Sequence, residues 1–208
     1  MVSQAFERAL SGFRDGVTAA DRLPVLVVTC WGAMAVVALI APSLIGALLV
    51  QGLALASLLI GVHRLWLLGE ARDRPVWQVP PHYLDVALWL LGVILSFAPT
   101  LWVGRSDLVL AGALAAIAGV LSLGTMTLLP GLAIGDDRAG YVACFRQMVP
   151  HAPMALVALA IAAIPGVLLL YLQTRVPKAA PILDPTARLL LALPLAAVSA
   201  RMRGLAPG

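Results

Sequence analysis

The chain has 208 residues, of which 62% are hydrophobic and 12% are charged, and its formal net charge at pH 7 is +4. An average globular protein is about half apolar and about one quarter charged, and a soluble fold of this size leaves much of its surface in water. The composition therefore excludes a disordered chain, a disulfide-rich secreted scaffold and a cytosolic enzyme. It predicts an all-α, polytopic membrane protein.

The basic residues and the cysteines narrow the expected partners. The 14 basic residues are spread over the polar connections instead of being gathered in one stretch. Membrane lipids are therefore the expected partners, and nucleic acid is not. Cys30 and Cys144 lie in unrelated contexts and match no disulfide or metal-binding spacing. We expect buried free thiols, no metal and no cofactor.

Residues 1–22 are expected to be an amphipathic segment that lies in the membrane interface, most of it as a helix. The apolar residues recur at steps of three and four, with polar side chains between them: Val2, Phe6, Leu10, Phe13 and Val17. This segment is too polar to cross a bilayer and suits a helix in the headgroup plane. The helix is expected to end near Gly16.

Residues 23–203 are expected to form a bundle of six transmembrane helices. The predicted spans are residues 23–41, 44–62, 84–104, 108–129, 152–172 and 185–203. Each is apolar over a length that matches the hydrocarbon core, and the last spans if Arg188 extends its guanidinium toward the interface.

Caps and breakers set the expected ends of these spans. Asp21 is placed to cap the first span, and Pro42 separates it from the second. The pair Pro130-Gly131 is expected to end the fourth span. The pair Asp184-Pro185 is typical of a helix start and is expected to begin the sixth.

The distribution of lysine and arginine predicts the orientation. Ten of these residues lie in the amino-terminal segment, the 63–83 and 136–151 connections and the carboxyl end, and four lie in the opposite connections. Basic residues favour the cytoplasmic side. Both termini are therefore expected in the cytoplasm.

Few polar groups in the spans offer chemistry. No ionisable residue falls near the middle of a predicted span, where an ion-coupled transporter would need one. Gln51 is the strongly polar residue at mid-span, and it suits either a ligand or channel contact or a single hydrogen bond between helices. His63, His82 and His151 fall near predicted interfaces, without metal-ligand spacing.

No catalytic residue is predicted. Asp136 and Asp137 could form an acid–base pair, but adjacent helical residues point in different directions and a solvated turn is favoured. The sequence contains no nucleophile-elbow, zinc-hydrolase or phosphate-loop motif.

Two further sets of residues are candidates for contacts. Arginines at the predicted interfaces are candidate lipid-headgroup contacts: Arg8, Arg14, Arg64, Arg72 and Arg74. Small residues spaced four apart let helix backbones approach closely, and the candidates for this role are Gly52, Ala56, Ala111, Ala115 and Gly119. Packing within the bundle and contact with another membrane-protein subunit are both open at these positions.

The order of features resembles bacterial multi-pass proteins related to the membrane domain attached to some glycerophosphodiester phosphodiesterases. The matching stretches are Phe6–Phe13, His63-Arg64 followed by Leu67-Leu68-Gly69-Glu70, Leu128 to Asp136, and Cys144-Phe145-Arg146. The hydrolase domain is absent from this chain, so the resemblance implies a bacterial inner-membrane location and no phosphodiesterase activity.

Three functional hypotheses follow from the sequence. The first is a non-enzymatic membrane protein that acts through lipid or protein contacts, in an accessory, scaffolding or envelope-maintenance role. The alternative is a transporter or permease for an apolar or neutral solute, which requires a continuous polar cavity near Gln51. A lipid-modifying enzyme would require residues of the 136–146 and 63–85 connections to cluster.

Overall fold

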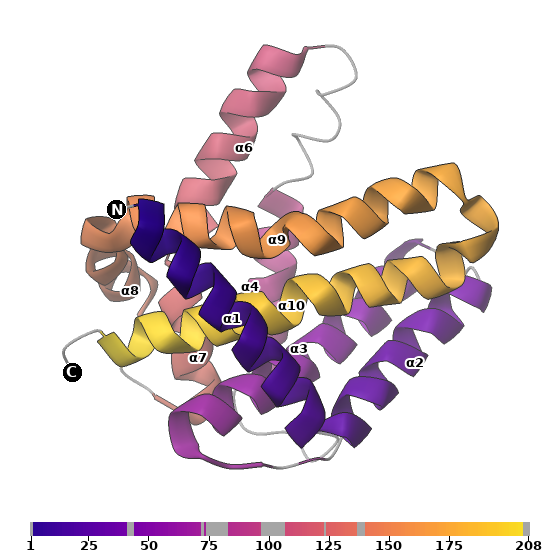
Figure 1. The fold of residues 1–208 in the computed structure, drawn as a ribbon, viewed down its shortest axis with the longest axis horizontal. Helices are drawn as coiled ribbons and strands as arrows, with labels where there is room; N and C mark the ends of the chain where they lie inside the picture. Colours follow the sequence, from indigo (N-terminus) through magenta and orange to yellow (C-terminus); the bar gives the residue numbers. More distant parts are fainter. Residues whose placement is uncertain are drawn as a thin grey trace.

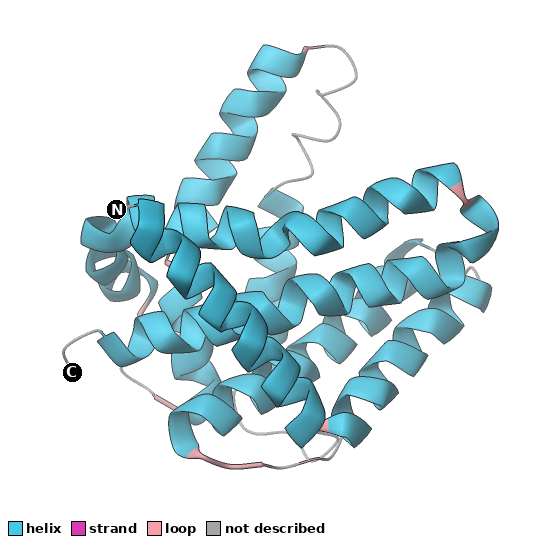
Figure 2. Ribbon diagram, viewed as in Figure 1, coloured by secondary structure: helices cyan, strands magenta, loops and turns pink. Residues whose placement is uncertain are grey.

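The computed structural model describes residues 2–40, 44–71, 73, 83–96, 107–122, 124–136 and 140–205, and these are almost entirely helical (Figures 1 and 2). The helices are α1 (Val2–Arg22), α2 (Pro24–Ile40), α3 (Leu44–Leu68), α4 (Tyr83–Ser96), α6 (Leu108–Ser122), α7 (Thr125–Ile134), α8 (Tyr141–Met148), α9 (Ala152–Arg175) and α10 (Ala180–Leu205). Single turns of 3₁₀ helix, Val149–His151 and Pro177–Ala179, precede α9 and α10. No strand occurs in these ranges, which confirms the predicted all-α class.

Several helices have the length and composition of membrane spans. Three stretches in the described parts of the chain are long and apolar enough to cross a membrane: Leu49–Leu68, Gly112–Ile134 and Ala180–Arg203. A fourth is added if the bent pair Leu10–Arg22 and Pro24–Ile40 counts as one span. The count of six spans stays a prediction, and residues 97–104 of the predicted third span lie outside the described residues.

Helix α10 lies at the centre of the molecule. It contacts α1, α2, α3, α7 and α9, and it crosses the middle of the view in Figure 1. Leu26 and Met34 of α2, Leu58 and Val62 of α3, and Leu193 of α10 share one buried cluster. Because lipid tails are as apolar as leucine, close packing is what favours such contacts in a bilayer.

Helices α1 and α2 meet at an angle of 95°. The expectation that the first helix ends near Gly16 is wrong, because α1 continues to Arg22. A Cβ atom on Gly16 would lie 3.1 Å from the Pro194 nitrogen and 3.2 Å from the Leu193 carbonyl carbon. Gly16 therefore serves the close approach of α1 to α10 and does not end the helix.

Asp73, and not the predicted Asp21, caps the start of α2. The Leu26 N–H donates a hydrogen bond of 2.9 Å to Asp73 Oδ1. The first N–H groups of a helix have no partner within it, and a carboxylate there satisfies one of them. Because α1 runs on to Arg22, Asp21 belongs to its last turn, and the cap comes from a residue 47 positions further along the chain.

Two helices end at a later residue than predicted, and in each case a glycine ends the helix. Helix α3 continues past residue 62 as far as Gly69, whose φ is +69°. Pro130 lies inside α7 and does not end it; Gly135, with φ of +80°, follows the last residue. Glycine adopts this left-handed conformation at low cost. Pro130, in the second turn of α7, removes one hydrogen bond of the helix but does not end it.

Helix α10 begins earlier than predicted, at Ala180. Asp184 therefore lies inside the helix, and it does not cap the start. Its carboxylate accepts hydrogen bonds from the Arg188 guanidinium, four residues further on, with a shortest N–O distance of 2.8 Å. The pair neutralises both charges near the beginning of the helix.

Candidate functional site

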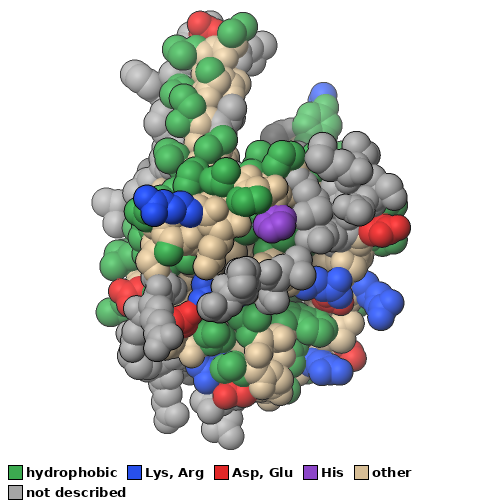
Figure 3. Space-filling view, turned by 90° about the vertical axis from the view of Figure 1, so that its left-hand side faces the viewer, with side chains coloured by type: hydrophobic (Ala, Val, Ile, Leu, Met, Phe, Trp, Pro, Cys, Tyr) green, Lys and Arg blue, Asp and Glu red, His purple; other side chains and the backbone are tan. Residues whose placement is uncertain are grey.

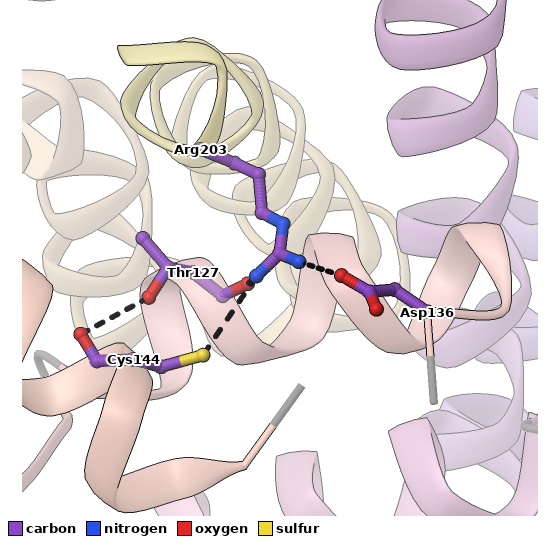
Figure 4. A network of polar contacts seen from close by, with 4 residues as sticks. All are labelled: Thr127, Asp136, Cys144 and Arg203. Atoms are coloured by element: carbon purple, nitrogen blue, oxygen red, sulfur yellow. Dashed lines mark hydrogen bonds and ion pairs between the residues drawn. The ribbon is translucent and has the colours of Figure 1, made fainter. Parts of the chain in front are cut away.

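A network of polar contacts joins the end of α10 to α7 and α8. Arg203 Nη1 donates a hydrogen bond of 3.0 Å to the Thr127 carbonyl oxygen, and Arg203 Nη2 forms an ion pair with Asp136. Figure 4 shows the guanidinium group between these two partners. A charged pair with fixed geometry orients the carboxyl end of α10 against α7.

Helix α8 joins the same network through Cys144. The Thr127 hydroxyl donates to the Cys144 carbonyl oxygen at 3.4 Å, and Arg203 Nη1 lies 3.7 Å from Cys144 Sγ (Figure 4). Both cysteines of the chain, Cys144 and Cys30, are buried free thiols, as the sequence predicted. In this setting Cys144 is a packing residue at a helix junction.

A second arginine binds α7 at its carboxyl end. The Arg64 side chain donates to Glu70 Oε2 at 3.0 and 2.8 Å, and Arg64 Nη1 donates to the Ala133 carbonyl oxygen at 3.3 Å. The last carbonyl groups of a helix are electron-rich and favour a nearby cation. Arg64 and Arg203 therefore hold α7 against α3 and α10.

His63 is buried beside this end of the bundle. Its side chain is 1% exposed and lies inside the protein, while its place near the membrane interface stays a prediction. Its Nε2 atom lies 2.8 Å from the Ser199 hydroxyl of α10. The reason is the length of α3: the helix runs on past residue 62, so His63 still faces α10 inside the bundle.

A cavity of about 220 Å³ lies next to the His63–Ser199 pair. Its wall is mostly apolar and comes from α3, α4, α7, α10 and the end of α6, with Leu55, Leu90 and Leu129 among the contributors. Ser122 and Thr125 add two hydroxyl groups to the wall. A concave apolar space with a few polar groups is the usual form of a small-molecule site.

A second cavity, of about 250 Å³, lies between α2, α3 and the start of α4. Three of its polar side chains are bonded within the protein. Tyr83 donates to the Leu53 carbonyl oxygen at 2.9 Å, the Ser57 hydroxyl donates to Tyr83 at 3.3 Å, and Cys30 Sγ lies 3.2 Å from the Ala54 carbonyl oxygen.

The predicted lipid-contact arginines have different surroundings. Arg14 is exposed on α1. Arg64 is turned into the protein, where Glu70 and α7 bind it. Arg72, Arg74 and the side chain of Arg8 lie outside the described residues. Figure 3, which views the side nearest to both termini, shows charged side chains of both signs on the main body of the molecule.

Gln51 does not belong to either cavity. Its side chain is half-buried on α3, and it is not part of the wall of either cavity described above. The polar route near Gln51 that a transporter would require therefore has no counterpart in these cavities.

The small residues predicted for helix packing are only partly used in this way. Ala56 is fully buried against α4 and α7. A Cβ atom on Gly52 or Gly119 would meet no atom within 4 Å, so neither glycine packs closely against another helix among the described residues. The side chains of Ala111 and Ala115 lie outside the described residues.

The sequence interpretation missed a close helix contact at Gly12 and Gly16. A Cβ atom on Gly12 would lie 2.5 Å from a Val198 methyl group, and Gly16 approaches the backbone of α10. Two glycines four residues apart are a known signal for close helix approach. Nearby, Asp15 is 6% exposed and pairs with Arg201 at 2.5 Å.

Among the described residues, the acidic side chains of the connections between helices do not cluster into a catalytic site. Asp136 is occupied by Arg203, Glu70 by Arg64, and Asp137 lies outside the described ranges. Within those ranges, no three histidine, cysteine, aspartate or glutamate residues gather as they would around a metal ion.

Comparison with known proteins gives no relative. No protein-family model, curated protein or solved structure matches this chain.

Proposed function

We propose that this protein is a non-enzymatic integral membrane protein that acts through contacts with lipids and with other membrane-protein subunits, in an accessory, scaffolding or envelope-maintenance role. The observation that carries the proposal is the distribution of charge along α10. Asp184–Arg188 lies near its beginning, and Asp15–Arg201 and Asp136–Arg203 lie near its end. Residues 189–200 between them are uncharged.

This spacing fits a bilayer. From residue 188 to residue 203 the helix rises by about 23 Å, and the hydrocarbon core is about 30 Å thick. Arginine side chains that extend toward the headgroups make up the difference. On this basis we assign the last helix as a membrane span and propose a bundle of six spans. We place the bundle in a bacterial inner membrane, with both termini in the cytoplasm.

We propose that α1 presents an apolar face to lipid while Gly12 and Gly16 hold its other side against α10. It turns by 95° into α2, and three of its large apolar side chains are exposed. Phe6, Leu10 and Val17 are 54%, 60% and 70% exposed, while Arg14 is exposed on the same helix. An apolar face beside basic side chains is the form that inserts between lipid headgroups and acyl chains.

The ionisable groups support a structural role over catalysis. Asp136, Glu70 and Asp15 each face an arginine that ties two helices together. A catalytic acid or base must be able to exchange a proton with a substrate, and these carboxylates are held as partners of cations. The resemblance to membrane domains of phosphodiesterases stays a prediction.

The test is purification of the full chain in a mild detergent, followed by native mass spectrometry. The wild type should retain lipid or a partner protein. The variant Phe6→Ser with Leu10→Ser and Val17→Ser should lose retained lipid, and Glu7→Gln, on the same helix, should not. A clean monomer that holds neither lipid nor protein and carries out solute flux would overturn the proposal.

The topology is tested separately with fusions. A fluorescent protein fused after residue 208 should fluoresce, because it matures in the cytoplasm, and the same protein inserted at residues 176–179 should not. Fluorescence at 176–179 with none at the carboxyl terminus would overturn the orientation. Equal fluorescence at both positions would overturn the assignment of α10 as a span.

A further inference from the structure

The His63–Ser199 pair leaves one buried polar atom without a partner. The Ser199 hydroxyl lies 2.9 Å from the Ala196 carbonyl oxygen and 2.8 Å from His63 Nε2. The serine hydroxyl donates its one proton to the Ala196 carbonyl oxygen, so it has none left to donate to His63. His63 Nε2 must then carry a proton and donate it to Ser199.

This assignment fixes the other ring nitrogen. The imidazole is neutral with its proton on Nε2, and Nδ1 carries a free lone pair. Nδ1 is buried and makes no hydrogen bond, while the whole side chain is 1% exposed. A buried acceptor without a donor is costly, which indicates that a donor from outside the protein belongs there.

The space beside His63 can hold such a donor. The cavity of about 220 Å³ is lined by both His63 and Ser199. It is larger than the apolar cavity of about 150 Å³ that is known to bind benzene. The rest of the wall is mostly leucine and alanine, which suits an apolar chain or ring.

The other polar groups of the wall do not compete for the same role. The Thr125 hydroxyl donates to the Ser122 carbonyl oxygen at 2.5 Å, and the Ser122 hydroxyl donates to the Ala118 carbonyl oxygen at 2.7 Å. Both hydroxyl protons are therefore already in hydrogen bonds, and neither hydroxyl can donate to His63 Nδ1.

We propose that the cavity between α3, α4, α7 and α10 is a binding site for a neutral lipid-like molecule that carries a hydroxyl group, with the hydroxyl donating to His63 and the apolar chain along the leucines. This inference rests on the proposed function, because the occupant is drawn from the bilayer. An anionic ligand does not fit, since a bare charge in an apolar wall would lose its hydration.

The test uses two photoreactive probes with the full chain in lipid nanodiscs. One is hexadecan-1-ol with a diazirine on its chain, and the other is hexadecane with the same diazirine. One hydrogen bond that relieves a buried acceptor corresponds to a preference of about tenfold. We therefore expect the alcohol to label the cavity residues Leu55, Leu59 and Met126 about tenfold more than the hydrocarbon does.

Variants identify the group responsible. His63→Phe removes the acceptor and keeps an aromatic ring, and it should reduce labelling by the alcohol to the level of the hydrocarbon. Ala192→Phe fills the cavity and should abolish labelling by both probes. His151→Phe, at an exposed position, should behave as the wild type. Equal labelling by the two probes in the wild type, or unchanged labelling in His63→Phe, would overturn the inference.

The same samples separate this inference from the proposed function. Val28 and Leu39 of α2 are exposed and should be labelled by the hydrocarbon in every variant if the bundle lies in lipid. Labelling there without labelling in the cavity refutes the binding site and leaves the proposed function standing. Absence of labelling at Val28 and Leu39 refutes the proposed function itself.

Discussion

The glycines of α1 and those of α6 have very different surroundings. A Cβ atom on Gly12 would lie 2.5 Å from a Val198 methyl group, and one on Gly16 would lie 3.1 Å from the Pro194 backbone nitrogen. A Cβ atom on Gly119 of α6 would meet nothing within 4 Å. Small residues at four-residue spacing therefore permit close approach but do not cause it, because a second helix must lie opposite.

The largest expected effect comes from filling the close contact. Gly16→Leu should lower the free energy of unfolding by about 2 kcal/mol or more, because overpacking against backbone atoms forces the two helices apart. Gly119→Leu, which adds the same side chain in open space, should change it little. Unfolding of both variants in mixed micelles measures the difference. Equal losses in the two variants would show that spacing, and not the facing helix, sets the contact.

The Asp15–Arg201 ion pair lies beside the contact between α1 and α10, and removing it measures how much the pair contributes to stability. Asp15 is 6% exposed, and its partner Arg201 has a side chain that is 52% exposed. Arg201→Met should cost about 1–2 kcal/mol, because it leaves a buried carboxylate unpaired, although solvent at the arginine reduces the effect. Exposed Arg146→Met is the control.

A double variant sharpens this prediction. Adding Asp15→Asn to Arg201→Met should recover part of the lost stability in the same unfolding measurement, because the carboxylate is then neutralised. A double variant less stable than Arg201→Met alone would contradict the explanation.

A smaller effect is expected at the corner between α1 and α2. Asp73→Ala removes the acceptor for the Leu26 N–H and should cost about 1 kcal/mol, as is usual for a helix cap. Asp21→Ala, at the cap predicted from the sequence, should cost less, because Asp21 lies exposed in the last turn of α1. Thermal unfolding followed by circular dichroism compares the two. A larger loss of stability in Asp21→Ala than in Asp73→Ala would show that Asp21 caps α2.

The sequence predicts the helices of this protein well, because apolar runs report directly on which segments leave water. Each predicted span is helical over almost all of its described part, but the fourth, residues 108–129, is divided between two helices, α6 and α7. Helix ends are harder. The sequence alone predicts helix ends at Pro130 and Gly16, yet α7 and α1 continue beyond these residues. A helix ends where its last carbonyl groups find other partners, and those partners come from tertiary contacts.

The candidate site could be predicted only in part. Hydropathy indicates the depth of His63 along a helix but not its partner, and Ser199 lies 136 residues away. Arg64 has the sequence of an interfacial arginine, but it binds Glu70 and the end of α7. Long-range pairs of this kind depend on how the helices are packed, which no local pattern contains.

The smallest expected effect concerns Gly52 of α3, where an added Cβ atom would meet nothing within 4 Å. Gly52→Ala should stabilise the isolated chain by up to about 1 kcal/mol, because alanine favours a helix interior over glycine. The same change tests the proposed contacts with other subunits. If a second protein packs on this face, Gly52→Leu should release it from the purified assembly while the chain itself stays folded. A partner retained by Gly52→Leu would place the subunit contact on a different face, away from α3.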